Sequence, residues 1–288
     1  MSLHELLIAP FAEFDFMRRA LVGCVVLALS CAPVGVLLVL RRMSLMGDAL
    51  SHAVLPGAAV GYLIGGFALP WLAGGGIVAA LLVAVLAGIA GRYTVLNEDA
   101  SFAGFYLMAL ALGVVLISRW GSQVDLIHLL FGSVLAIDDA ALYVVAAVAT
   151  ISIAWLALCY RGVVLECVDP GFLSAAGRGG SPYHLGLIVL TVLNLVAGFQ
   201  AMGTLMAIGL MMLPATVARL WADTLPGLMG VAWGVGLVST IGGLLVSYHA
   251  GLPSGPAIVL VASLFYLVSL TLAPHGWRGQ RGSQGDAR

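Results

Sequence analysis

The sequence predicts an all-α polytopic membrane protein, a bundle of 8–9 transmembrane helices. Hydrophobic residues make up 62% of the 288 residues and charged residues only 9%, and the mean hydropathy is +1.11. The apolar residues form long continuous runs rather than short alternating segments, which favours membrane helices over a β-barrel. No polar interval reaches the length of about 50 residues that a soluble domain needs. We therefore expect a single helical bundle.

A bilayer-spanning helix needs about 20 apolar residues, and this length divides the chain into nine segments. In order they are 20–40, 49–67, 70–90, 102–117, 140–160, 184–199, 204–221, 228–247 and 256–273. The number of spans stays at eight or nine because Gly203, Gly209 and Pro214 interrupt the apolar run 202–221, as in a broken helix. Residues 124–135 are too few to cross, which is compatible with a re-entrant or surface segment.

The parts outside the spans have distinct expected roles. Residues 1–18 are predicted to form an interfacial segment with Phe11 and Phe14 on its apolar face, residues 19–274 the transmembrane domain, and residues 275–288 a polar C-terminal tail. Glu166 lies in the longest polar interval, 161–183, and we expect a solvated carboxylate there. The four cysteines lack metal-binding spacing, so we expect packing residues without a disulfide.

Arginine placement predicts which ends of the spans face the cytoplasm. The chain contains no lysine. If the loops near 91–100, 161–183 and 222–226 and the C-terminus are inside, most of the arginines that follow the first two spans are inside as well. Arg18-Arg19 and Arg41-Arg42 flank one span and cannot both be inside, so the side of the N-terminus stays open.

Asp48 and His52 place a carboxylate and an imidazole four residues apart in the stretch 41–57. On a helix this spacing puts both side chains on one face, together with Ser51 nearby. The two groups suit a divalent transition metal, and in hydrocarbon they would cost several kcal/mol without a partner. Pro56 has no N–H, so the carbonyl of His52 loses its helical partner and is available to an ion or water. A hydrogen-bonded pair that joins two helices is the structural alternative.

The interval 161–183 also contains a predicted short surface helix. Asp169 is a plausible N-cap with Pro170 at the first helical position, and Gly177 is a reasonable C-terminal stop. A helix of this kind between two spans suits the docking of a soluble partner on the cytoplasmic face.

Three segments of the chain match the pattern of a known family. They are RRMSLMGDALSHAVLPG at 41–57, Asp169-Pro170 followed by Ala176-Gly177, and GTLMAIGLMMLPA at 203–215. The first is long and specific. Together they resemble the membrane permease subunits of bacterial zinc and manganese importers of the ABC-3 type.

The resemblance implies a type II ABC importer-like permease in the bacterial cytoplasmic (inner) membrane. It implies a homodimer, two ATP-binding cassette subunits and an extracytoplasmic metal-binding protein as partners, and no nucleic acid. The transported ion is expected to be zinc first, or manganese or iron, with no permanently bound cofactor and with ATP used by the partner subunit. The expected site residues are Asp48 and His52 for the metal, Pro56 and Pro214 as helix breaks on the pathway, and Asp169, Pro170, Ala176 and Gly177 for coupling to the ATPase.

Other functions remain open from the residues alone. An intramembrane zinc metalloenzyme is disfavoured because a hydrolytic zinc site uses about three protein ligands and a general base, and the sequence has no HExxH. An ion-coupled secondary transporter would work without an ATPase. A permease for iron chelates or corrinoids would share the multi-helix plan but lack the Asp/His pattern. The chain has no GxxxxGK[ST] sequence, so it does not hydrolyse ATP by that route. From the resemblance we expect a transporter permease subunit rather than an enzyme, with ATP hydrolysis in a separate partner.

Overall fold

The structure, a computed structural model, describes residues 8–66, 68–95, 98–120, 137–168 and 181–277. In these ranges the chain forms a short helix, α2 (Ala9–Glu13), and nine long helices. The long helices are α3 (Asp15–Leu40), α4 (Met46–Gly65), α5 (Leu69–Tyr93), α6 (Glu98–Trp120), α8 (Asp139–Val168), α10 (Ser181–Met202), α11 (Thr204–Trp221), α12 (Leu225–Ala250) and α13 (Ser254–Leu272). Each predicted span corresponds to one of them, which confirms the all-α membrane fold.

The count of spans depends on α4. In the described ranges, eight helices are long and apolar enough to cross a membrane, and α4 is not among them. Its 20 residues include Asp48, Ser51 and His52 in the first two turns, which lowers its apolar character. The run 202–221 breaks at Gly203, whose φ of 96° separates α10 from α11, and α11 then continues through Pro214. The segment predicted at 124–135 lies outside the described residues.

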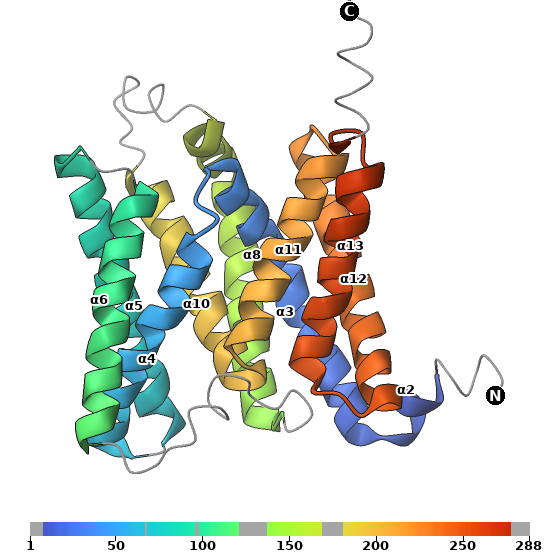
Figure 1. Cartoon of the computed structure of the whole chain (residues 1–288), viewed down its shortest axis with the longest axis horizontal. Coiled ribbons are helices and arrows are strands. Elements are labelled where there is room, and N and C mark those ends of the chain that lie inside the picture. The colour runs from blue at the N-terminus through green and yellow to red at the C-terminus, as the bar shows by residue number, and fades with distance from the viewer. Residues whose placement is uncertain (1–7, 67, 96–97, 121–136, 169–180, 278–288) are drawn as a thin grey trace, which may run out of the picture.

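The helices form two groups joined by central ones (Figure 1). Helix α4 packs against α5 and α6, while α11, α12 and α13 pack against one another and both α11 and α12 pack against α3. Helix α10 contacts α8, α3 and α11 on one side and α4 and α5 on the other. In Figure 1, α4 begins part of the way down from the upper edge at which α3 ends, so its first turn lies inside the outline of the bundle.

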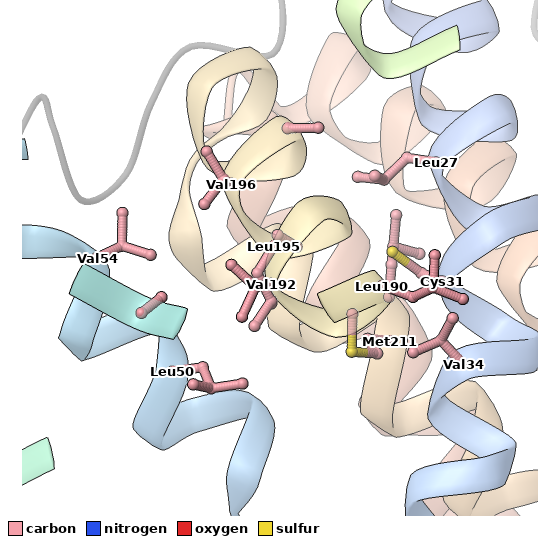
Figure 2. Packing of buried hydrophobic residues seen from close by; sticks show 14 of the residues in the cluster. Leu27, Cys31, Val34, Leu50, Val54, Leu190, Val192, Leu195, Val196 and Met211 are labelled. Atoms are coloured by element: carbon pink, nitrogen blue, oxygen red, sulfur yellow. The ribbon is translucent and has the colours of Figure 1, made fainter. Parts of the chain in front are cut away.

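Helix α10 carries much of the shared core. Figure 2 shows Leu50 and Val54 of α4 on one side of α10, and Leu27 and Cys31 of α3 on the other. Buried Asn194 of α10 donates a hydrogen bond to the hydroxyl of Ser152 in α8 at 2.7 Å and another to the carbonyl of Leu190 at 2.8 Å. In lipid such a bond holds two helices together because neither partner can turn to water.

All four cysteines are free thiols, and Cys24 and Cys31 are buried in α3. Cys24 and Cys31 lie in the main hydrophobic core and Cys159 and Cys167 pack against it, which confirms the expectation of packing residues.

The expectation of a solvated Glu166 is wrong. Helix α8 extends to Val168, eight residues beyond the predicted end of its span, and it carries the Glu166 side chain into the protein at 8% exposure. Its Oε1 lies 3.7 Å from Nη2 of Arg41, whose side chain is 11% exposed. Among the described residues, Nη1 of Arg41 and Oε2 of Glu166 have no hydrogen-bond partner. This buried ion pair joins the end of α3 to the end of α8.

Glycines bring α4 and α5 into backbone contact. A Cβ at Gly57 would collide with the carbonyl oxygen of Gly75, and a Cβ at Gly75 would collide with that of Gly57. One turn further along α4, a Cβ at Gly61 would meet the carbonyl of Trp71, and one at Gly65 would meet its ring. The stripe at 57, 61 and 65 therefore has the four-residue spacing of close helix packing in membranes.

We predict that Gly75→Ala destabilises the protein by about 1–3 kcal/mol relative to Gly74→Ala, because the methyl group forces the α4 and α5 backbones apart. Gly74 is the matched control: it lies in the same helix, and a Cβ there meets nothing within 4 Å. Thermal unfolding in detergent, followed by circular dichroism, measures the difference. Equal melting temperatures for the two variants would contradict the close packing.

We predict that Glu166→Gln destabilises the protein by about 3–5 kcal/mol, because it leaves the Arg41 charge buried without a counter-ion. Replacing both partners by methionine should restore most of this stability, since no charge is then buried. The control is Asp139→Asn. It removes an exposed pair with Arg19, 3.3 Å apart, and should cost at most about 1 kcal/mol. Wild-type unfolding of the Glu166→Gln protein would show that the pair contributes nothing.

Candidate metal site

The connection from α3 to α4 fixes where the site begins. Helix α3 ends in a Schellman motif, in which the Arg42 N–H donates to the Val39 carbonyl at 3.1 Å and the Met43 N–H donates to the Leu38 carbonyl at 2.9 Å. Arg42 occupies the left-handed position with φ of 59°, where glycine is usual. Buried Met43 and Leu38 close the apolar side of the turn. The chain therefore reverses within a few residues, and α4 starts at Met46.

Asp48 and His52 lie together on α4, as the spacing predicts. The Asp48 Oδ1 atom is 3.6 Å from Nε2 of His52, and their side chains are 53% and 34% exposed, respectively. Asp48 is the third residue of the helix, where the helix dipole stabilises a negative charge. Two donors that bind one ion at about 2.1 Å with a tetrahedral angle are about 3.4 Å apart, so a small side-chain movement places both on one ion.

The pair offers two candidate ligands, and the described residues bring no third such side chain to it. Across the described residues there is no group of three or more His, Cys, Asp or Glu side chains able to hold a metal ion. Ser51 does not add one: its hydroxyl donates to the carbonyl of Asp48 at 2.7 Å, so it bonds back to its own helix. Further ligands have to come from backbone carbonyls, water or another molecule.

Helix α6 covers one side of the pair. The ring of Tyr106 stacks on the imidazole of His52, with centroids 5.8 Å apart and planes at 26°. Further along the same two helices, a Cβ at Gly113 would lie 3.2 Å from the Cδ and N atoms of Pro56. Because Gly113 has no side chain, α6 can approach Pro56, and this approach brings Tyr106 next to His52.

The other predicted site residues have mixed outcomes. Pro56 and Pro214 are both buried inside helices that continue past them, so each removes a hydrogen bond without ending its helix. Asp169, Pro170, Ala176 and Gly177 lie outside the described residues. The expectation about their role in coupling therefore stays a prediction.

Sequence reasoning missed two contacts at or near the site. Tyr106 stands in a long apolar run, where an aromatic residue is ordinary and gives no signal. The partner of Arg41 was also missed, since Glu166 is more than a hundred residues away in the chain and no local pattern connects them.

The chain is similar to named permease and transport-system membrane proteins over nearly its whole length. The family model described as ABC 3 transport family matches residues 13–273. The manganese import system permease protein ScaB of Streptococcus parasanguinis is 33% identical over 91% of this chain and 92% of its own. The chelated iron transport system membrane protein YfeD of Yersinia pestis is 33% identical over 93% of this chain and 89% of its own.

A solved structure shares the fold. The structure titled PsaBC from Streptococcus pneumoniae in complex with Fab superimposes with a TM-score of 0.82 at 31% identity, covering 95% of this chain and 97% of that one. These relatives are transporter permeases, which confirms the expectation of a transporter subunit in place of an enzyme. The chain belongs to the ABC 3 transport family and is a multi-pass permease subunit of the cytoplasmic membrane.

Proposed function

We propose that this permease imports a divalent transition-metal ion, and that Asp48 and His52 bind the ion during its passage. The observation that carries the proposal is a carboxylate and an imidazole 3.6 Å apart on a half-exposed face of α4. Two side chains with additional carbonyl or water ligands bind an ion weakly enough to release it, as transport requires. A closed cage of four protein ligands would instead hold it.

A second copy of the chain is the partner that best explains the exposed pair. An ionisable group facing lipid is costly, so the open face of α4 needs cover by protein or water. Around a two-fold axis the same face of each copy meets itself, and the two pairs would supply four ligands to one ion. The translocation pathway would then run along the dimer axis.

Energy is proposed to come from two ATP-binding cassette subunits at the cytoplasmic edge. The ends of α3, α8 and α13 lie at one edge of the bundle (Figure 1). The described arginines of that edge are Arg41, Arg42, Arg92, Arg161 and Arg219. The positive-inside rule favours this edge as the cytoplasmic one, with the N-terminal end of α3 outside. Asp169, Pro170, Ala176 and Gly177 would contact the ATPase there, and an external metal-binding protein would deliver the ion opposite.

Manganese is the first ion to test. Several relatives are named as manganese permeases, and YfeD is named for chelated iron. A carboxylate with an imidazole accepts manganese, iron or zinc, and affinity alone favours zinc over the other two. The zinc preference expected from the residues stays a prediction.

We predict that Asp48→Ala and His52→Ala each lower metal uptake at least about tenfold, because each removes one of the two proposed side-chain ligands. The measurement is manganese and zinc accumulation in cells that lack their own importer and express this chain, its ATPase and its binding protein. Ser51→Ala is the matched control, since its hydroxyl bonds only to the helix backbone in this structure, and it should transport normally.

Equal membrane levels of every variant are required for this comparison. Wild-type uptake by both the Asp48 and the His52 variants would reduce the pair to a packing contact and contradict the proposed site. Uptake that collapses for one metal but not the other would name the transported ion.

We predict that the purified chain alone does not move manganese or zinc across liposomes, and that flux appears when the ATPase, ATP and the metal-loaded binding protein are present. The expected ATP dependence follows from membership of the ABC family, in which the permease provides the path and the partner the energy. Metal flux through the chain alone would favour a secondary transporter. One tightly bound zinc per purified chain would favour a metalloenzyme.

A further inference from the structure

We propose that Tyr106 is a positioning residue that holds the His52 imidazole ready for the metal and favours the metal-bound state. This inference rests on the proposed function of the Asp48 and His52 pair. The observation that carries it is the stack of the two rings, with centroids 5.8 Å apart and planes at 26°. Both values lie in the range of attractive offset stacking.

The stack fixes an orientation that α4 alone does not fix. A histidine on a helix can turn about two side-chain bonds, and only some of those rotamers point Nε2 toward Asp48. Tyr106 lies on a different helix, α6, and rests against the face of the imidazole, while the Asp48 carboxylate lies 3.6 Å from the ring edge at Nε2. Tyr106 of α6 therefore stacks on the imidazole, and Asp48 of α4 lies near its edge at Nε2.

The approach of α6 that creates this stack is built into the packing. Phe102, one turn before Tyr106, is 1% exposed, and Gly113 lies against Pro56. Tyr106 itself is partly buried and packs against the main hydrophobic core. The packing at Phe102 and at Gly113, on either side of Tyr106 along α6, therefore holds this part of the helix in place.

The chemistry of the two rings gives a preference between states. A metal ion on Nε2 withdraws electron density from the imidazole and makes it resemble a cation. The face of a phenol ring is electron-rich and attracts a cationic partner more than a neutral one. The stack should therefore be stronger when His52 carries the ion, so Tyr106 would add affinity without donating a ligand atom.

The test is manganese binding to the purified permease with its ATPase in lipid nanodiscs, with free Mn²⁺ counted by electron paramagnetic resonance. Tyr106→Leu keeps a side chain of related size but removes the ring, and should weaken binding about three- to tenfold. Tyr106→Phe keeps the ring and should bind within about twofold of wild type. Tyr143→Leu is the matched control, because that tyrosine is 76% exposed on α8 and should not affect binding.

The outcomes separate this inference from the proposed site. If Asp48→Ala and His52→Ala abolish binding while Tyr106→Leu binds as wild type, the positioning role is wrong and the site stands. If Asp48→Ala and His52→Ala bind as wild type, the site itself is wrong. Equal weakening by Tyr106→Phe and Tyr106→Leu would assign the effect to the hydroxyl and overturn the stacking argument.

A structural role alone makes a different prediction. Damage to packing would lower the amount of folded protein. Uptake would then fall by the same factor at every metal concentration. Positioning should raise the free Mn²⁺ concentration for half-saturation of the purified permease with its ATPase and leave the amount of folded protein within about twofold. If Tyr106→Leu does not yield folded protein, Tyr106→Met provides the same comparison with a more adaptable side chain.

Discussion

The structure depends on one constraint: in lipid, a polar group must be met by protein or water, because hydrocarbon offers no hydrogen bond. The backbone satisfies this requirement by forming helices in the described membrane segments. Some buried side chains meet it in pairs between helices, as Asn194 does with Ser152 and Arg41 with Glu166. Asp48 and His52 are different, since they have each other but keep a half-exposed face. Our proposal that their remaining partner lies outside the chain starts from this exposure.

Close backbone contact supplies the rigidity that hydrophobic burial cannot supply between helices in a membrane. Gly57 and Gly75 allow the backbones of α4 and α5 to touch, and Gly113 allows α6 to contact Pro56. Helix α4 is not among the eight described helices that are long and apolar enough to cross a membrane, and it is held on two sides by α5 and α6. Its polar residues can therefore stay on the open face without the helix losing its place.

The number of ligands argues for transport over catalysis. If Asp48 and His52 bind the ion as proposed, one chain contributes two side-chain ligands from the described residues, fewer than a resident catalytic zinc uses. It suits an ion that binds briefly and moves on, and symmetry can double the set. Family membership agrees with this, and the relatives' names direct attention to manganese and iron.

The sequence by itself determined the helical membrane fold, the nine long segments and the shared face of Asp48 and His52, because apolar length and a four-residue spacing are local properties of the chain. Only the tertiary structure decided that Glu166 is buried against Arg41 and that Tyr106 stacks on His52. It also decided that Pro214 leaves α11 continuous while Gly203 ends α10. The contacts of Glu166 and Tyr106 depend on which helices become neighbours. The sequence pattern within one helix does not predict which helix packs beside it.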